Sequence, residues 1–494
     1  MEFLTNLVPP NFEFQVQYLA IILITVGILY IGYLKIKASS SSIPPGSLGF
    51  PLIGETISFL MAQKQDKSKQ WFEIRVQKYG PVFKTSLVGS PIVVLTGQAA
   101  NKFIFSANDA IAGNQMLSTA TIFGKYSIFE VEGSRRKLIK SAMMNFLKPE
   151  SIQKIIVEMD SIVKKYLLKE LEGKESVQFV PLIKKVTFKV TSTLLFGLHE
   201  GWDKEKLFED LTIAFRGLWA IPLRIPGTKF RKACQARDRV CKTLSKLIKT
   251  RKEDMEEGKM GSQQDMISTF LSLRDEEGKP LLEEEIIDNL ITLIFASQDT
   301  SSCLVCLFFQ YLGRDTNVYN KVLEEHKEIA KTRVESDGKL KWSEMQSMKY
   351  TWKAVQELMR LKPPLSGNFR YVTRDISFGG YDIPKGWRIL WVAFPTHMDP
   401  EIFDEPEKFQ PSRFEGPSKS VPPYTYIPFG AGSRICPGSE FARIDVLLII
   451  HHLVTNYGWT PLIPNEPLIH DPMPYPAKGL PVRLQPMLDQ ENTT

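Results

Sequence analysis

The sequence predicts a mainly helical α+β body with small β-sheets, preceded by one transmembrane helix. From Ser151 to Phe196, and again from Lys229 to Lys252, apolar residues recur at helical spacing with charged residues between them. From Thr85 to Thr96, β-branched runs flank a Gly-Ser-Pro turn, which is typical of a hairpin. Residues 14–34 carry no charge and, as a helix, would reach about 30 Å, enough to cross a bilayer core.

Composition narrows the class of protein. A chain of 494 residues leaves the number of domains open, but 43% apolar and 24% charged residues favour a large folded core. The net charge of +7 comes from 62 basic and 55 acidic residues spread along the chain, so we expect no nucleic-acid partner. The basic cluster from Lys229 to Lys252 indicates either a solvated helix face or a surface for an acidic redox partner or a membrane. Five cysteines are few and odd in number, which favours a reducing compartment.

Charges around the apolar segment predict its orientation. Glu2 and Glu13 precede it, whereas Lys35 and Lys37 follow it. The positive-inside tendency then places the N-terminus in the lumen of the endoplasmic reticulum and the body in the cytosol, as a single-pass protein. A cleaved signal peptide is the alternative, but the segment is long and lacks a basic flank before it.

Three regions follow from this pattern. Residues 1–37 form a lumenal tip and anchor, and 38–51 form a hinge of serines followed by prolines. Residues 52–494 form the body. Within it, an almost wholly apolar stretch from Leu282 to Leu312 predicts a helix through the core, and residues 376–383 with 387–392 predict a second small sheet.

A glycine-rich loop around Cys436 is the most informative segment. A thiolate that holds a haem iron needs a tight loop, and Gly430, Gly432 and Gly438 permit close backbone approach and unusual dihedrals. Arg434 can neutralise a haem propionate and Phe429 can shield the sulfur. The apolar helix that follows would favour a thiolate through its N-terminal dipole. The alternative is a buried free cysteine in a glycine-rich turn.

The whole window decides between these readings. Residues Phe429 to Gly438 fit F-x-x-G-x-R-x-C-x-G and resemble the cytochrome P450 haem-binding signature at every fixed position. The resemblance implies the cytochrome P450 fold, heme b with iron, and Cys436 as the axial metal ligand. It excludes the free-cysteine reading.

Two more elements stand in the order that this family shows. Glu357 and Arg360 match its E-x-x-R helix; at i, i+3 they share one helical face, and Arg413 could complete a buried charge network. Any exposed helix can contain such a pair, so the motif is informative only because it lies well before the cysteine loop, in the order that the family shows. Arg370 follows where the family places a propionate partner, and Arg136 and Lys140 are further propionate contacts or ordinary surface charges.

Polar residues interrupt the apolar central helix at Asp299 and Thr300. Thr300 could simply bond back to a carbonyl one turn earlier, with Asp299 as a solvated charge. The surrounding apolar residues argue against that, and the segment resembles the family's oxygen-activation motif, in which an acid and an alcohol relay protons. The resemblance makes both residues catalytic. Ser297 and Gln298 depart from the common form of this motif, and the Ser297 side chain could narrow the helix groove in which oxygen sits.

Other patterns have ordinary explanations. Cys303 and Cys306 form C-x-x-C inside the apolar helix without a second pair, which indicates core packing. The six histidines form no ligand set. No glycine-rich dinucleotide motif is found, so electrons should come from another protein. The resemblance implies that this other protein is an NADPH-cytochrome P450 reductase and that O2 is the co-substrate.

The resemblance also indicates a substrate class. The stretches at 348–352, 383–387, 411–416 and 471–484 resemble plant triterpenoid oxidases of the β-amyrin oxidase group, and taxoid hydroxylases share some of them. We therefore expect a large hydrophobic terpenoid, most of all a triterpene, with a taxoid, other diterpenoid or sterol as the alternative. A haem-thiolate isomerase and a non-catalytic haem protein are the other classes. The resemblance implies a substrate pocket lined by Phe295, Ala296, Leu365, Ser366 and Gly367.

Overall fold

The computed structural model describes most of residues 42–487, with gaps at 52, 107–109, 114–115, 199–202, 260–264, 335–338, 416–420 and 471–472. Of the predicted membrane segment it describes Tyr18, Ile21, Thr25 and Gly27, which are helical. The rest of that segment lies outside the described residues. The one described helix long and apolar enough to cross a membrane is Glu283–Leu312, and 83% of its most apolar window is buried inside the protein.

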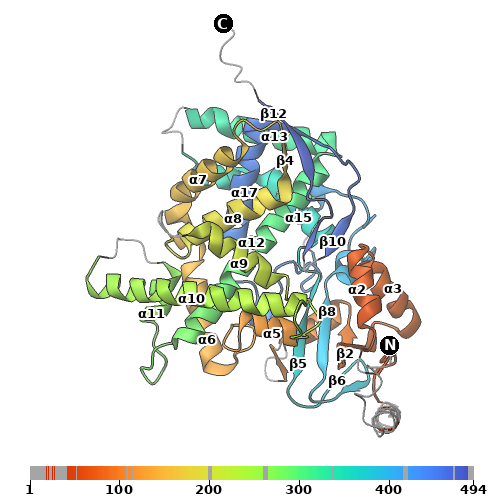
Figure 1. The fold of residues 1–494 in the computed structure, drawn as a ribbon. Helices are drawn as coiled ribbons and strands as arrows, with labels where there is room; N and C mark the ends of the chain where they lie inside the picture. Colours follow the sequence, from red (N-terminus) through yellow and green to blue (C-terminus); the bar gives the residue numbers. More distant parts are fainter. Residues whose placement is uncertain are drawn as a thin grey trace, which may run out of the picture.

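Most of the long helices lie at the left and top of Figure 1, where β4 and β12 also lie, and the large sheet lies at the lower right beside α2 and α3. The central helix α12 (Glu283–Leu312) packs against α8 (Phe179–Leu194) and α17 (Ser439–Asn456), and α17 also packs against α7 (Pro149–Leu171). All but six of the residues of α12 are buried, as its apolar sequence predicts. The remaining helices are α2 (Thr56–Lys64), α3 (Ser68–Tyr79), α4 (Gln98–Ser106), α5 (Leu117–Phe123), α6 (Gly133–Phe146), α9 (Lys204–Phe215), α10 (Lys229–Glu256), α11 (Met266–Ser272), α13 (Thr316–Val334), α14 (Trp342–Ser347), α15 (Lys349–Leu361) and α16 (Phe394–His397).

The largest sheet has five strands in the order β1-β2-β8-β5-β3. The predicted hairpin forms its edge, with Val82 paired to Leu95 and Leu87 to Ser90. Its strands are β1 (Val82–Leu87), β2 (Ser90–Leu95), β8 (Arg388–Val392), β5 (Gly367–Val372) and β3 (Ile111–Ala112). The smaller sheets contain β4 (Ser176–Gln178), β12 (Pro481–Pro486) and β9 (Tyr457–Pro461); β10 (Leu468–His470) and β11 (Pro474–Pro476); and β6 (Ile376–Phe378) and β7 (Tyr381–Ile383).

The predicted second sheet is wrong in one respect. Residues 376–383 do form the hairpin β6–β7, but residues 388–392 do not join it. Strand β8 instead pairs parallel to β2 and antiparallel to β5 in the large sheet. Four of its five residues are buried, because it lies between two neighbours there.

The described part of the predicted hinge follows the sheet. The amide of Lys84 donates to the carbonyl of Pro45 at 2.8 Å, and the amide of Asp382 donates to Ser42 at 2.6 Å. Residues 42–46 therefore dock on β1 and β7. The boundary at residues 38–51 stays a prediction.

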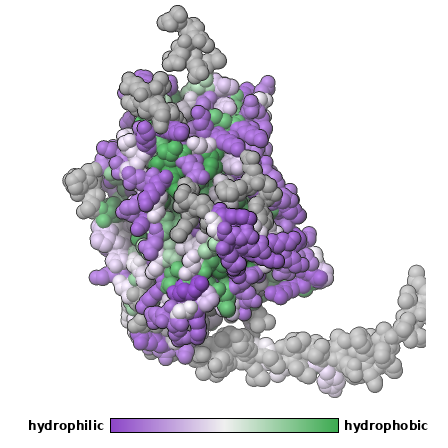
Figure 2. All heavy atoms as spheres, turned by 90° about the vertical axis from the view of Figure 1, so that its left-hand side faces the viewer, coloured by the Kyte–Doolittle hydropathy of each residue, from purple (hydrophilic) through white to green (hydrophobic). Residues whose placement is uncertain are grey.

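Polar side chains cover much of the surface opposite the sheets, with smaller apolar areas between them (Figure 2). In the basic helix α10, the residues that face inward are apolar, from Phe230 to Ile248. Its lysines and arginines mostly lie on the other face. This arrangement is that of an amphipathic surface helix.

Candidate active site

Cys436 lies in the turn between a short 3-10 helix, Gly432–Arg434, and α17. The Cys436 amide donates to the carbonyl of Phe429 at 2.9 Å, which closes the loop. Gly432 has φ +60°, and a Cβ atom there would lie 2.3 Å from the carbonyl oxygen of Phe105. Gly430 has φ +71°. These two positions therefore need glycine.

Gly438 differs from this expectation. Its φ is −100°, and an added Cβ would meet only Leu147, at 3.9 Å. The predicted unusual dihedral is wrong at this position. Gly438 instead precedes the first residue of α17. Burial raises the pKa of the Cys436 thiol, whereas the hydrogen bond from the Gly438 amide and the charge of Lys140 lower that pKa by less.

Four cationic side chains gather beside this loop. On α6, Arg136 donates to the carbonyl of Ser433 at 3.2 Å and Lys140 donates to the same oxygen. Arg434 forms an ion pair of 2.5 Å with Glu132. Arg370, only 7% exposed, donates to the carbonyl of Phe369 at 2.7 Å.

This cluster carries more positive than negative charge. Burial, followed by repulsion from Arg434 and Arg136, lowers the pKa of Arg370 to about 9. Burial and the charge of Arg434 also lower the pKa of Arg136, and its Nε atom is buried without a hydrogen-bond partner. Glu132 is the carboxylate that acts on both arginines. The cluster is thus suited to a dianionic group.

Asp299 and Thr300 lie in the middle of α12 but make different contacts. The Thr300 hydroxyl donates to the carbonyl of Ala296 at 2.6 Å, as back-bonded helix hydroxyls do. Asp299 is 3% exposed, and its Oδ1 atom lies 3.0 Å from the ammonium of Lys184 on α8. The structure does not bring the two side chains into contact.

Tyr475 of β11 completes the surroundings of Asp299. Its hydroxyl donates to the Asp299 carbonyl at 2.8 Å and lies 2.7 Å from the Ser302 hydroxyl. The Lys184 ammonium stands 4.0 Å from the centre of the Tyr475 ring. Sequence reasoning did not identify Lys184. It did not identify Tyr475 as a neighbour of the acid either.

The predicted pocket residues fall into two groups. Phe295 is buried, and its ring centre lies 5.2 Å from that of Phe123 and 4.9 Å from that of Phe215. Ala296 is exposed although its helix is otherwise mostly buried, so open space lies against α12 at this point. Leu365, 39% exposed, and Ser366 are also exposed.

Gly367 of β5 approaches the neighbouring strand closely. A Cβ atom there would lie 2.4 Å from the carbonyl oxygen of Trp391. The need for glycine at this position is therefore structural.

Glu357, Arg360 and Arg413 meet in the core. Arg360 donates to both carboxylate oxygens of Glu357 at 2.8 Å, and both side chains are fully buried. Arg413 donates to Glu357 at 3.2 Å. Arg360 also donates to the carbonyls of His397 and Pro406, each at 2.8 Å. The network ties α15 to the segment that leads toward the cysteine loop.

Other polar groups serve packing. Cys303 and Cys306 are both buried, and the Cys303 thiol donates to the carbonyl of Pro474 at 3.2 Å. Within the part of the chain that the structure describes, no three His, Cys, Asp or Glu side chains are grouped as a metal site.

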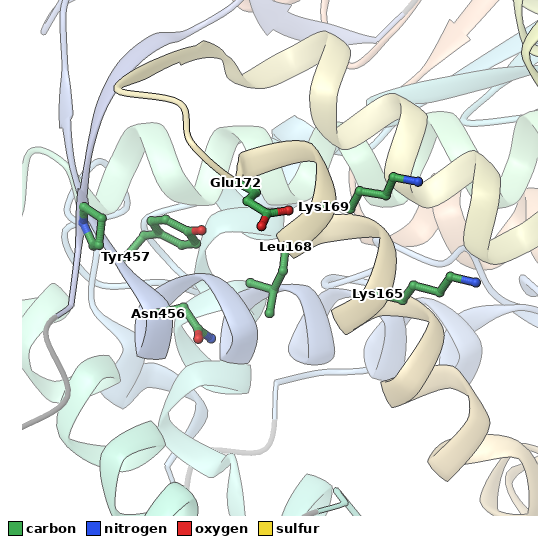
Figure 3. A pocket seen from close by; sticks show the side chains of 7 residues that line it. Lys165, Leu168, Lys169, Glu172, Asn456 and Tyr457 are labelled. Carbon is green, nitrogen blue, oxygen red and sulfur yellow. The ribbon is translucent and has the colours of Figure 1, made fainter. Parts of the chain in front are cut away.

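A surface hollow between α7, β9 and β12 contains none of the predicted site residues. There the ammonium groups of Lys165 and Lys169 point away from Tyr457 (Figure 3).

Comparison with known proteins identifies the family. The family model described as "Cytochrome P450" matches residues 44–480, which is most of the chain. The chain belongs to the cytochrome P450 family. It is 40% identical to taxane 10-beta-hydroxylase of Taxus cuspidata, over 91% of this chain and 90% of that protein. It is 36% identical to beta-amyrin 28-monooxygenase of Medicago truncatula, over 97% and 99% respectively.

A solved structure of this family has the same fold. The retinoic acid-bound cyanobacterial CYP120A1 superimposes with a TM-score of 0.80 at 31% identity, over 90% of this chain and 99% of that one. The predicted cytochrome P450 fold, enzyme class and family are therefore confirmed. The chain is a cytochrome P450 monooxygenase, which uses O2, a reductase partner and heme b with an axial cysteine thiolate.

The residues present fit that cofactor. Heme b carries two carboxylate groups, and the cluster of Arg136, Lys140, Arg370 and Arg434 has surplus positive charge and one buried donor without a partner. The glycine loop at 430–432 brings Cys436 close to this cluster. Open space lies against Ala296 on the central helix.

Proposed function

We propose that this cytochrome P450 hydroxylates a large polycyclic terpenoid, most of all a triterpene of the β-amyrin type. The observation that carries the proposal is the identity of 36–40%, over nine-tenths of the chain or more, to enzymes named for taxane, taxoid or β-amyrin substrates. These substrates are rigid fused-ring terpenoids. A taxane diterpene is the second candidate, because the 40% match is to a taxane hydroxylase.

In this proposal, the proximal residues hold the haem. Cys436 is the axial ligand, held by the backbone of Phe429, Gly430, Gly432 and Gly438. Arg370, Arg434, Arg136 and Lys140 bind the two propionates, which explains their surplus charge. The haem thiolate supplies electron density that favours O–O cleavage. Glu357, Arg360 and Arg413 hold the loop in place.

Asp299 and Thr300 move protons on the distal side. The Asp299 carboxylate accepts a proton at Oδ1, where the Lys184 ammonium contacts it, and Lys184 is 23% exposed and so reaches solvent. Thr300 follows Asp299 in the sequence and lies one helical turn after Ala296, beside the open space. The path runs from solvent past Lys184 and Asp299 to the Thr300 hydroxyl.

Phe295, Ala296, Leu365, Ser366 and Gly367 line the substrate pocket in this proposal. The wall is mostly apolar, which suits a ligand with few polar groups. A small apolar cavity lies between α2, the β1–β2 turn and residues 218–221, and Phe59, Trp219 and Phe369 line it. In this proposal it marks the entry for the substrate.

Exposed apolar side chains surround this entry. Ile57 and Met61 on α2 are 58% and 54% exposed, and Ile221, Leu223 and Ile225 are 50–58% exposed. Such a patch marks an interaction with a membrane or a protein. We propose that it rests on the endoplasmic reticulum membrane, with the anchor at 1–37 crossing it, so that the substrate enters from lipid.

Two experiments test the proposal. The chain is co-expressed with NADPH-cytochrome P450 reductase in yeast that makes β-amyrin and, separately, supplied with a taxane diterpene. Oxidised β-amyrin is expected. A taxane product alone would establish the second candidate, and the absence of both products would overturn the terpenoid assignment.

The second experiment deletes residues 1–37. The shortened protein should retain the carbon-monoxide band and bind membranes more weakly, and Ile221→Ser together with Ile225→Ser should remove the residual membrane binding.

A further inference from the structure

The last residue of α5 carries an aromatic side chain that packs against Phe295, one of the proposed pocket residues. Phe123 ends α5, and its ring centre lies 5.2 Å from that of Phe295 and 5.3 Å from that of Phe129. Gly124 follows with φ +97°. The position of the Phe123 ring therefore depends on what holds residues 122–128.

Asp288 of α12 holds this loop on one side. Its Oδ2 atom accepts from the amide of Tyr126 at 3.0 Å, and its Oδ1 atom accepts from Arg237 of α10 at 2.5 Å. Arg237 also donates to the carbonyl of Ile122 at 2.9 Å. Asp288 is 4% exposed, so these bonds are shielded from water.

Asn289 holds the same loop through both ends of its amide. Its Oδ1 atom accepts from the amide of Ile128 at 2.9 Å, and its Nδ2 atom donates to the carbonyl of Tyr126 at 2.9 Å. Nδ2 also donates to the carbonyl of Glu285 at 2.8 Å within α12. The side chain is fully buried. Asp288 and Asn289 therefore bond to three backbone groups of the loop.

Close packing makes the contact specific. A Cβ atom on Gly124 would lie 2.0 Å from the Asp288 carboxylate, so no side chain fits between loop and helix. Asp288 and Phe295 are seven residues apart, two turns of one helix, and so lie on the same side of it. The helix that holds the loop thus also carries the aromatic residue against which Phe123 packs.

We propose that Asp288, Asn289 and Arg237 are positioning residues that fix the Phe123 wall, and thereby determine which carbon of a rigid substrate is oxidised. A fused-ring ligand cannot bend to follow a displaced wall. Displacement of a positioning wall by about 1 Å is enough to change reactivity by about 10²-fold. Loosening the loop should therefore spread oxidation over several carbons rather than abolish it.

The test compares Asp288→Asn and Asn289→Ala with Glu284→Gln. Asp288 uses both carboxylate oxygens, whereas an amide has one acceptor, so Asp288→Asn must lose the Arg237 or the Tyr126 bond. Glu284 is the matched control, because it faces Lys125 of the same loop at 3.8 Å but both side chains are more than 70% exposed. All variants are first checked for the reduced carbon-monoxide band.

Two readouts need no substrate. In hydrogen exchange, the amides of Tyr126 and Ile128 should lose protection in the two variants and keep it in Glu284→Gln. Clotrimazole, a bulky azole, should bind about five- to tenfold more weakly, whereas imidazole, which does not reach the wall, should change by less than about twofold. Failure of the proposed terpenoid function would leave both readouts intact.

The product readout rests on the proposed function. With β-amyrin, the variants should give a mixture of regioisomers in place of one dominant product, with total turnover retained within about tenfold. Gly124→Ala, which pushes the loop away from Asp288, should give the same mixture and decides the matter if Asp288→Asn does not fold. Protection, azole selectivity and product ratio identical to those of Glu284→Gln would overturn the proposal.

Discussion

The ammonium group of Lys184 lies 3.0 Å from the carboxylate of Asp299, on two helices that pack side by side. Asp299 is almost fully buried, and its backbone carbonyl accepts a hydrogen bond from Tyr475. A buried carboxylate needs such a partner, because desolvation of an unpaired charge is costly. The same pair links the acid of the central helix to solvent.

Asp299→Asn should nearly stop product formation. The amide keeps the size and the Tyr475 contact of the acid but cannot exchange a proton, and acid-base assistance is worth about 10²–10⁴-fold. Product formed from β-amyrin at saturating reductase should fall by about 10²-fold or more, with the carbon-monoxide band retained. A rate within about threefold of wild type would remove Asp299 from proton delivery.

Lys184→Met should lower stability, because it leaves the Asp299 carboxylate buried without its ion partner. The expected loss of free energy of unfolding is about 1–3 kcal/mol. The double variant Lys184→Met with Asp299→Asn should recover much of that loss, since no unpaired charge remains. A thermal-unfolding cycle of the four proteins measures this coupling, and additive effects would contradict the ion pair.

Thr300→Ala should separate electron use from product. If the hydroxyl delivers protons, the variant folds and binds haem, but NADPH oxidation should yield hydrogen peroxide in solution rather than hydroxylated product. Ser297→Ala is the control, because Ser297 also bonds back along the helix, to the Leu293 carbonyl at 2.7 Å. Equal product per NADPH in both variants would make the Thr300 hydroxyl merely structural.

Glu357→Gln should destabilise the fold strongly. Arg360 is fully buried, and removal of its carboxylate partner leaves an uncompensated charge, which costs about 3–5 kcal/mol. Lys408→Gln breaks an i, i+3 pair with Glu405 in which both side chains are about half exposed or more, and should leave the stability almost unchanged. Thermal unfolding and haem retention measure both, and similar losses would contradict the buried network.

The buried side chain of Asp445 on α17 should make the stability of the folded protein depend on pH. Burial raises the pKa of Asp445 to about 7, although the nearby Ser301 hydroxyl lowers it. The unfolded chain releases this proton near pH 3.9. From about pH 4 to pH 7 the folded chain therefore binds the extra proton, and its stability falls by about 1.4 kcal/mol per pH unit.

Asp445→Asn removes this titration. The variant should gain stability relative to wild type as pH rises from 5 to 7, and the difference should level off above about pH 8. Thermal unfolding of both proteins across this range measures the difference. A difference that does not vary with pH would show that Asp445 keeps an ordinary pKa.

The parts of the fold that could be predicted from the sequence are those with a local cause. The β1–β2 hairpin depends on one turn, α12 on an unbroken apolar run, and the Glu357–Arg360 pair on i, i+3 spacing. The placement of β8 depends on pairing with β2, almost 300 residues earlier in the chain, and no local pattern encodes that.

The site shows the same division. The loop around Cys436 was recognisable because its glycines and arginine stand within ten residues. The partner of Asp299 was not, because Lys184 lies on another helix and resembles any surface lysine in sequence. Tyr475 likewise reaches Asp299 only through the packing of β11 on α12. Contacts between distant segments depend on how the helices and strands pack, and a local sequence pattern does not predict them.

The assignment of the axial ligand is tested most directly by the reduced carbon-monoxide difference spectrum of Cys436→Ser. Serine is a far weaker donor than a thiolate, so the thiolate-type band should disappear. Cys234→Ser and Cys241→Ser, at half-buried positions on α10, are the controls and should keep it. A Cys436→Ser protein that retains the thiolate-type band would contradict the account.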